Sequence, residues 1–381
     1  MFHFLKIFKQ NKELKQFYLS IFLRRIGMSL IGIFTPIYFY QIGYSIVEIL
    51  FFYFLVSFIY LFFSYTAAKI ISKIGEKHAI LLATFFDILF FIGLIFLEDL
   101  SLLFYILPFI AVPAMSFYWM SYHLLFTQES HKNERSQELS MIGILIILAG
   151  VITPYLGGLI AQENFNFLFI ISAFFMLIST IPLFLSKDKR PQLSFNPSKV
   201  IKDFFNTENR GTIISFTAFG VEHIIDLVIW PIFIITIVGN LEKTGLIVSI
   251  TTLLSLLVYK LIGKYSDRTN KISLLKKGNA FYTFSLFLRL FAVTTPLILF
   301  IDSMKNMAGK ILEVPLSAHK TELSKRIDYF EFIFVQENFY KLSRVTIIPL
   351  LMFIFWIGYY PFTITVIIAA LFSLGYKYIH K

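Results

Sequence analysis

The sequence has no cysteine and few charged residues, and each shortage excludes a class of protein. Without cysteine, the 381-residue chain can form no disulfide bond, has no thiolate nucleophile and offers no Cys ligand to a metal or cluster. Charged residues make up only 15% of it, against about 25% in soluble domains. A soluble globule of this composition would lack polar surface, which excludes a cytosolic enzyme, a nucleic-acid-binding domain and a secreted disulfide scaffold.

Apolar residues make up 57% of the chain, and 47 Phe and 20 Tyr are among them. At about 20 residues per membrane-spanning helix, this is enough for about eleven spans. The mean hydropathy of +0.75 supports the same conclusion. The composition therefore predicts a polytopic, all-α membrane protein.

Apolar runs separated by short polar breaks predict twelve transmembrane helices. In the first half they lie near Phe17–Gln41, Val47–Ile71, Ala79–Leu97, Ser101–Thr127, Ser136–Ala161 and Phe165–Leu185. In the second half they lie near Thr212–Gly239, Thr244–Tyr265, Leu274–Ile301, Ser303–Ser324, Ile327–Trp356 and Pro361–Ile379. The segment from Ser303 is too polar to face lipid all round, so we expect it to line water or to pack against protein.

One long polar break lies near the middle of the chain. Residues 186–211 contain two prolines and six Lys or Arg residues, and they divide six predicted helices from six. We therefore predict an N-terminal six-helix bundle over 17–185, a cytoplasmic linker over 186–211 and a C-terminal six-helix bundle over 212–381. Residues 1–16, with four lysines, are expected to lie as an amphipathic segment on the cytoplasmic membrane surface, with no cleavable signal.

Positive charges follow the alternate breaks of this pattern. Lys and Arg crowd the N-terminus, the breaks after the second, fourth, eighth and tenth helices, the linker and the C-terminus. The other breaks hold almost none, with Lys243 and Lys305 as the exceptions. The positive-inside rule then predicts that both termini are cytoplasmic, which also accounts for the net charge of +11.

Two of the cytoplasmic breaks resemble each other at an offset of 195 residues. The first reads AKIISKIGEKHAILL from Ala68, and the second reads GKYSDRTNKISLLKK from Gly263. These breaks resemble the loop motif of the major facilitator superfamily. The second copy keeps Gly263, Asp267, Arg268 and Lys271, and the first keeps Lys73, Gly75 and Lys77.

The fifth predicted helix contains a second element of this kind. Pro154, Gly157 and Gly158 are similar to the Pro-x-x-Gly-Gly element of the same superfamily. The resemblance implies two six-helix bundles that rock around a central cavity. It also implies that Asp267 and Arg268 form a charge pair that holds the cytoplasmic side closed. The first copy has the uncharged Ser72 in place of the aspartate, so this role is in doubt there.

Ionisable side chains inside the predicted helices are costly and are therefore candidate functional residues. In the second half we predict that Glu222, Asp226 and Glu313 carry protons, facing the cations Lys310 and Arg344 across a water-filled space. Asp226 follows Glu222 by one turn, and Trp230 continues the same face. Trp230, Lys310 and Arg344 are candidate substrate contacts. Alternatively, these charges form structural ion pairs within the second bundle. No partner can be predicted for Asp87 or Arg289.

The first half contains fewer such charges. Arg24 and Arg25 lie two turns into the first helix, and we expect them to snorkel to the cytoplasmic interface. In the fourth helix, aromatic and titratable side chains at Tyr118, Trp119, Tyr122 and His123 are candidate substrate contacts, although plain helix packing would also explain them.

These features together predict a secondary transporter that moves a small organic molecule with protons, as a monomer in a bacterial plasma membrane. The aromatic residues favour export of amphipathic compounds. An uptake carrier for a sugar or an organic anion, with Lys310 and Arg344 as anion contacts, is the alternative. A non-transporting sensor, assembly factor or acyltransferase is the alternative of another class.

No nucleotide-binding loop, catalytic motif or metal-spaced cluster is present, so we expect no enzyme activity, no cofactor and no metal.

Overall fold

The computed structural model describes residues 12–129, 135–185, 200, 209–266, 271–323 and 329–380. Every regular element in these residues is a helix. The first half forms α2 (Lys12–Ile31), α3 (Phe34–Gln41), α4 (Ile46–Ile74), α5 (Glu76–Ile95), α6 (Leu103–Glu129), α7 (Arg135–Glu163) and α8 (Phe165–Phe184). The second half forms α10 (Arg210–Ile224), η2 (Ile225–Ile229), α11 (Trp230–Val238), α12 (Leu241–Ser266), α13 (Lys271–Leu288), η3 (Arg289–Phe291), α14 (Thr295–Leu323), α15 (Tyr329–Ile357), α16 (Pro361–Ser373) and η4 (Leu374–His380).

Ten helical segments of the described chain are long and apolar enough to cross a membrane. Three of these segments join consecutive elements: Glu13–Gln41 joins α2 and α3, Arg210–Val238 joins α10, η2 and α11, and Pro361–Ile379 joins α16 and η4. The helices α13 and α14 are not among the ten, because lysines lie along the first and charged residues along the second. The chain is therefore a multi-pass integral membrane protein.

The turn between α13 and α14 corrects the sequence prediction for this region. We predicted one helix over Leu274–Ile301 and the next from Ser303, but α13 ends at Leu288 and α14 begins at Thr295. The residues around this turn are almost all apolar, so hydropathy could not locate it. Pro296 at the start of α14 suits the first turn of a helix, where no backbone donor is needed. Lys305, predicted at an outer break, consequently lies inside α14.

Local signals fix the other turns of the first half. Ser45 and Glu48 form a reciprocal capping box at the start of α4, with the Ser45 side chain accepting from the Glu48 amide. Gly75 joins α4 to α5 at a φ of +84°, a conformation that side chains with a Cβ rarely adopt. This backbone requirement explains the glycine of the first loop motif.

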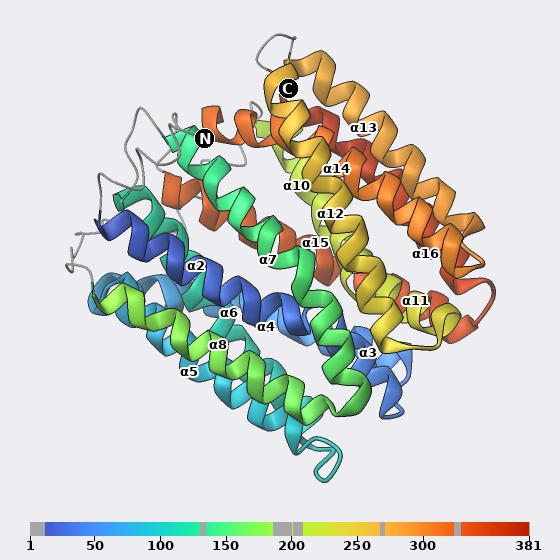
Figure 1. Ribbon diagram of the computed structural model, residues 1–381, viewed down its shortest axis with the longest axis horizontal. Coiled ribbons are helices and arrows are strands. Elements are labelled where there is room, and N and C mark those ends of the chain that lie inside the picture. Colours follow the sequence, from blue (N-terminus) through green and yellow to red (C-terminus); the bar gives the residue numbers. More distant parts are fainter. Residues whose placement is uncertain are drawn as a thin grey trace.

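The two halves of the chain lie side by side (Figure 1). Helices α2 to α8 form one side and α10 to η4 the other, and contacts between the two sides are made mainly by α7 with α12 and by α4 with α15. We call the end at which α2 begins and η4 finishes the terminal end. The turns that join α3 to α4, α7 to α8 and α11 to α12 lie at the opposite end.

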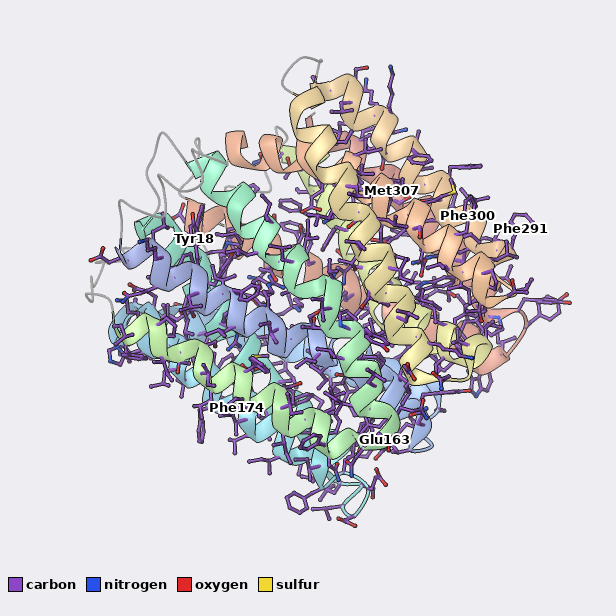
Figure 2. The ribbon with its side chains drawn as sticks, viewed as in Figure 1. Tyr18, Glu163, Phe174, Phe291, Phe300 and Met307 are labelled. Atoms are coloured by element: carbon purple, nitrogen blue, oxygen red, sulfur yellow. The ribbon has the colours of Figure 1, made fainter. Side chains whose placement is uncertain are left out.

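Apolar side chains cover the outside of the helices. Phe174, Phe291 and Phe300 project away from the ribbon (Figure 2), and each is more than half exposed. In water such a surface would cause aggregation, but in a bilayer it meets acyl chains. The outer surface therefore agrees with a lipid-embedded protein.

The helix α7 packs against its neighbours through the Pro-x-x-Gly-Gly element. A Cβ on Gly157 would lie 2.2 Å from the Leu30 carbonyl oxygen of α2, and one on Gly158 would lie 2.4 Å from the Leu241 carbonyl oxygen of α12. On α12, a Cβ on Gly245 would lie 2.2 Å from the Pro154 carbonyl oxygen. Only glycine permits these backbones to approach so closely.

Hydrogen bonds reinforce this contact between α7 and α12. Because Pro154 interrupts the bonding pattern of α7, the Tyr155 amide donates to the Ser249 Oγ of α12 at 3.0 Å. The Gln162 Oε1 accepts from the Leu241 amide at 2.9 Å. Both bonds join the two halves near the opposite end.

Candidate functional site

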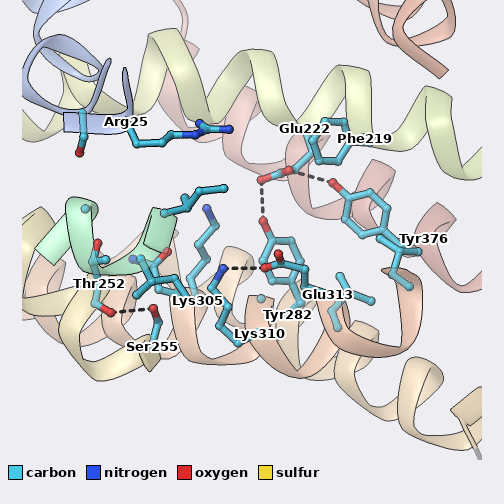
Figure 3. A pocket seen from close by; sticks show the side chains of 18 of the residues that line it. Arg25, Phe219, Glu222, Thr252, Ser255, Tyr282, Lys305, Lys310, Glu313 and Tyr376 are labelled. Carbon is cyan, nitrogen blue, oxygen red and sulfur yellow. Dashed lines mark hydrogen bonds and ion pairs between the residues drawn. The ribbon is translucent and has the colours of Figure 1, made fainter. Parts of the chain in front are cut away.

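A cavity of about 540 Å³ lies between the two halves of the chain (Figure 3). Seven elements contribute to its wall: α2, α7, α10, α12, α13, α14 and η4. Its polar lining includes Arg25, Ser29, Glu222, Thr252, Ser255, Tyr282, Lys305, Asn306, Lys310, Glu313 and Tyr376. This size and lining suit a small organic ligand with several polar groups.

The cavity extends from the middle of the helices towards the terminal end. Thr252 and Ser255 lie near the centre of α12, whereas Leu316 and Tyr376 lie nearer the ends of their helices. Towards the opposite end, the glycine contacts and hydrogen bonds between α7 and α12 close the space between the halves.

Glu222 is the buried acid of the cavity. Its side chain is 3% exposed and accepts hydrogen bonds from the Tyr282 hydroxyl at 2.9 Å and the Tyr376 hydroxyl at 2.8 Å. In Figure 3 both tyrosines point towards its carboxylate. Among the described residues, no cationic side chain lies within 4.0 Å of it. Two hydroxyls rather than a cation therefore satisfy this carboxyl group.

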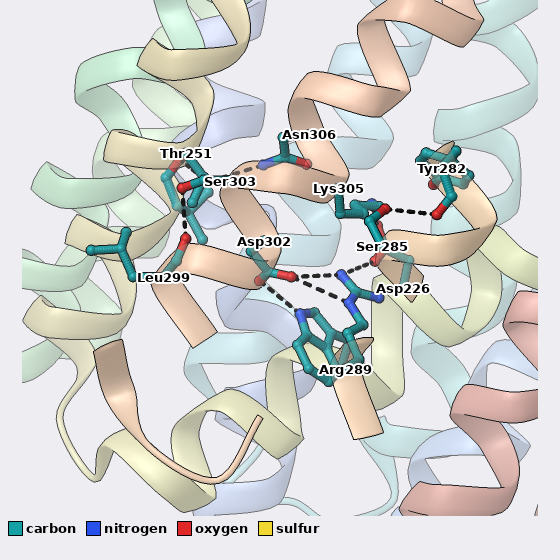
Figure 4. A network of polar contacts seen from close by, with 12 residues as sticks. Asp226, Thr251, Tyr282, Ser285, Arg289, Leu299, Asp302, Ser303, Lys305 and Asn306 are labelled. Carbon is teal, nitrogen blue, oxygen red and sulfur yellow. Dashed lines mark hydrogen bonds and ion pairs between the residues drawn. The ribbon is translucent and has the colours of Figure 1, made fainter. Parts of the chain in front are cut away.

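Asp226 has two cationic partners instead. The Lys305 Nζ lies 2.6 Å from one of its carboxylate oxygens, and the Arg289 guanidinium lies 2.8 Å from the other. Arg289 also contacts Asp302 at 3.0 Å (Figure 4). The network contains two acids and two cations, so its net charge is zero. Buried charges require such opposite partners.

Trp230 belongs to the same network. Its indole Nε1 donates to Asp302 at 2.8 Å, and the Arg289 guanidinium lies over its ring at 3.9 Å. Asp226 lies in the π-helix Ile225–Ile229, whose i→i+5 hydrogen bonds change the residue spacing along the helix face ahead of Trp230. Glu222, Asp226 and Trp230 were predicted to share one helix face, but in the structure they bind different partners.

The predicted partners of these acids differ from those in the structure. We expected the acids to face Lys310 and Arg344, but Asp226 binds Lys305 and Arg289, neither of which was predicted as its partner. Lys310 pairs with Glu313 at 2.6 Å on its own helix, and the Glu313 side chain is half exposed. The substrate-contact roles predicted for Lys310 and Arg344 stay predictions.

Arg344 lies outside the lining of this cavity. Its guanidinium is 3.3 Å from the His223 Nδ1, and one turn away Lys341 lies 4.9 Å from the centre of the Tyr60 ring of α4. The Ser64 hydroxyl of α4 donates to the Asn338 side chain at 3.0 Å nearby. This polar group joins α15 and α10 to the first half of the chain.

Arg24 and Arg25 do not snorkel to an interface, contrary to the sequence prediction. Arg24 is 3% exposed, forms an ion pair with Asp87 and donates to the Thr84 hydroxyl at 3.1 Å. Arg25 extends from α2 into the cavity. The sequence signal for the Arg24–Asp87 pair was two opposite charges on different helices, but only the tertiary structure, in which Arg24 of α2 reaches Asp87 of α5, identifies them as partners.

The aromatic residues of α6 lie behind these arginines. Tyr118 and Tyr122 are 4% and 6% exposed, with ring centres 5.8 Å apart. The Arg24 guanidinium lies 3.8 Å from the Tyr118 ring centre, and the Arg25 guanidinium 5.1 Å from that of Trp119. Trp119 also stacks on His123 at 6.1 Å. None of the four contributes to the wall of this cavity, and their role as substrate contacts stays a prediction.

The loop motifs lie at the terminal end. Lys73 is exposed in the last turn of α4, while Lys77 is buried in the first turn of α5. Gly263 lies in α12 and Lys271 begins α13, but Asp267 and Arg268 lie outside the described residues. Within the described part of the chain, no three His, Asp or Glu side chains are grouped closely enough to hold a metal ion.

A sequence model of the Major Facilitator Superfamily matches residues 17–309. Several solved transporters share the fold. A mutant of the nucleoside transporter NupG is 13% identical with a TM-score of 0.72, over 97% of this chain and 99% of that one. A D-xylose–proton symporter is 12% identical with a TM-score of 0.70, over 95% and 96%.

A POT family transporter in complex with 5-aminolevulinic acid is 14% identical with a TM-score of 0.73, over 95% of this chain and 94% of that one. At such identities these similarities describe the fold and not the substrate. No curated protein matches the chain in sequence.

Proposed function

Because the chain belongs to the major facilitator superfamily, we propose that it is a secondary active transporter that moves a small polar organic molecule, with protons, by alternating access. The observation that carries this proposal is the cavity between the two halves, which is closed towards one end by the contact between α7 and α12. Such a site, open to one side at a time, is what alternating access requires.

The proposal includes twelve spanning helices, with α13 and α14 added to the ten apolar ones. Their charges support this, since Lys305 and Lys310 of α14 line the cavity and need not meet lipid. The bundles are residues 17–185 and 212–381, with 186–211 as a cytoplasmic linker between them. With both termini in the cytoplasm of a bacterial cell, the cavity is in its inward-facing form, and a monomer contains the whole site.

Proton coupling is proposed at Glu222. This carboxyl group lines the cavity, is buried and has no cation within 4.0 Å among the described residues. A proton removes the cost of burying its charge, whereas Asp226 already has two cations as partners. Glu313, half exposed and paired with Lys310, is less suited to carry a proton across.

The charged lining of the cavity favours a polar solute over an amphipathic one. Export of amphipathic compounds was suggested by the α6 aromatics, which are buried against arginines. We therefore propose uptake of a polar nutrient.

The test uses single cysteines, since the native chain has none. Ser255→Cys reports on the cavity, and Ser249→Cys reports on the α7–α12 contact. An impermeant maleimide applied from the cytoplasmic side is expected to label Ser255→Cys, while Ser249→Cys is protected. Conditions that favour the outward-facing form should reverse both reactivities.

The rival class, a non-transporting sensor or assembly factor, predicts no such reversal. The two cysteines are compared in mildly acidic to mildly alkaline buffers and after the α7–α12 contact is loosened. If their reactivities never change in opposite directions, alternating access is disproved. A cysteine at exposed Lys243, outside the moving contact, controls for general changes in labelling.

A further inference from the structure

Among the described charged side chains around the cavity, Arg25 and Glu222 stand outside the ion pairs. Lys310 pairs with Glu313, and Lys305 and Arg289 balance Asp226 and Asp302. Arg25 stands apart from these pairs. Among the described residues, no carboxylate lies within 4.0 Å of it, and its Nε is buried with no hydrogen-bond partner.

Arg25 is also held in a position from which it can bind a ligand. Its guanidinium lies over the Trp119 ring, 5.1 Å from the ring centre, and its side chain extends from α2 into the cavity (Figure 3). Stacking on an aromatic face leaves the in-plane N–H donors of a guanidinium available. These donors match the paired oxygens of an anionic group.

The opposite wall provides a second cation. Lys305 lines the cavity and contacts Asp226, but Asp226 is also bound by Arg289. An anion that attracts Lys305 therefore leaves Asp226 with a cationic partner. Because Arg25 belongs to the first half of the chain and Lys305 to the second, one anionic ligand could bind both halves.

We propose that the transported solute is an organic monoanion whose charged group binds Arg25 and is shared with Lys305, while a proton on Glu222 accompanies it. In the empty cavity, ionised Glu222 balances Arg25 across the site. When the anion binds, its negative charge replaces that of Glu222 as the counter-charge to Arg25, and Glu222 accepts a proton. The net charge of the site is then the same with and without the anion. The transport step is then electroneutral anion–proton symport. This inference rests on the proposed transport function and names its substrate class.

The uncharged part of the ligand has polar neighbours. Ser29, Thr252, Ser255 and Asn306 line the cavity with hydroxyl and amide groups, and Phe219 adds an aromatic wall. Hydroxylated or aromatic carboxylates fit this lining.

The experiment compares matched anionic and neutral probes on the purified full-length protein. Gluconate is tested against glucose, and 4-hydroxybenzoate against 4-hydroxybenzamide, by the shift in thermal unfolding temperature. We expect at least one anion to stabilise the protein more than its neutral partner, and more strongly in mildly acidic buffer. Arg25→Gln should weaken that binding about tenfold or more, and Arg25→Lys should retain part of it.

The unfolding temperature without ligand shows whether each variant is folded. If Arg25→Gln does not fold, Arg25→Lys still tests the role of Arg25. The proposal is overturned if neutral probes stabilise as well as the anions, if no anion stabilises, or if the variants bind an anion like the native protein. The cysteine labelling at Ser249 and Ser255 needs no ligand. If it reverses while the anions fail, transport stands and only the substrate class is wrong.

Discussion

Single residues decide how this protein keeps charges inside a membrane. Arg24 pairs with Asp87, and Arg289 bridges Asp226 and Asp302. The sequence identified Arg24, Asp87, Asp226 and Arg289 as charges within predicted helices but could not pair them, and it placed Asp302 at a break. Arg24 and Asp87, 63 residues apart, are neighbours only in the tertiary structure.

The Arg24–Asp87 pair gives a stability prediction. Asp87→Asn leaves a guanidinium that is 3% exposed without its counter-charge, which is expected to destabilise the protein by about 3–5 kcal/mol. Arg24→Gln should have a similar effect, and the double variant should be more stable than either single one. Denaturation in detergent measures all three. Simple additivity of the two effects would show that the pair is not coupled.

Glu222 gives a prediction about pH. Glu222→Gln keeps the side-chain shape, with a carbonyl that accepts from one of the Tyr282 and Tyr376 hydroxyls and an NH2 group that donates to the other, but it cannot exchange a proton. The labelling rate of Ser249→Cys, divided by that of Lys243→Cys to remove the pH dependence of the thiol itself, is expected to depend on pH in the native background and to lose that dependence with Glu222→Gln. The matched control is Glu313→Gln, at a half-exposed acid, which should keep the native pH response. A pH response that survives in Glu222→Gln would move the proton site elsewhere.

At the scale of elements, glycines set the distance between α7 and α12. The sequence identified Gly157 and Gly158 through a resemblance, and the structure gives the physical reason. A Cβ on Gly158 would meet the Leu241 carbonyl oxygen, so the element allows two backbones to touch across the halves. Gly245 makes the reciprocal contact and carried no recognised motif.

Gly158→Ala is therefore expected to loosen the α7–α12 contact. The methyl group would lie 2.4 Å from a backbone oxygen, which cannot move without the helix. Ser249→Cys should become more reactive in this background. Gly150→Ala is the matched control on the same helix, because its Cβ would meet its nearest neighbour at 3.4 Å, an ordinary contact. Equal labelling in the two backgrounds would argue against this contact as the seal.

The helix boundaries illustrate why some elements were predictable and one was not. Ser45, Gly75 and Gly239 mark turns with local chemistry that the sequence displays. The turn at 292–294 lies within an apolar stretch, so the prediction from hydropathy was one continuous helix across it. This error placed Asp302 between two predicted helices and Lys305 at the start of the second, and so hid two members of the charge network.

At the scale of the whole molecule, the distribution of lysine and arginine predicts orientation. Ser72 and Lys243 are both exposed and lie at the terminal and opposite ends, respectively. In intact cells an impermeant maleimide should label Lys243→Cys and not Ser72→Cys, and permeabilisation should expose the second. The reverse result would invert the topology and make the cavity outward-facing.

The sequence by itself determined that this is a helical membrane protein of the major facilitator superfamily, and it identified ionisable residues within the helices, Glu222 and Asp226 among them. These are local properties, since hydropathy and residue spacing are read along the chain. Only the tertiary structure decided that Glu222 binds two tyrosines, that Asp226 binds Lys305 and Arg289, and that Arg25 enters the cavity. The physical reason is that a buried charge is satisfied by side chains on neighbouring helices, and helix neighbours are chosen by packing between segments far apart in the chain.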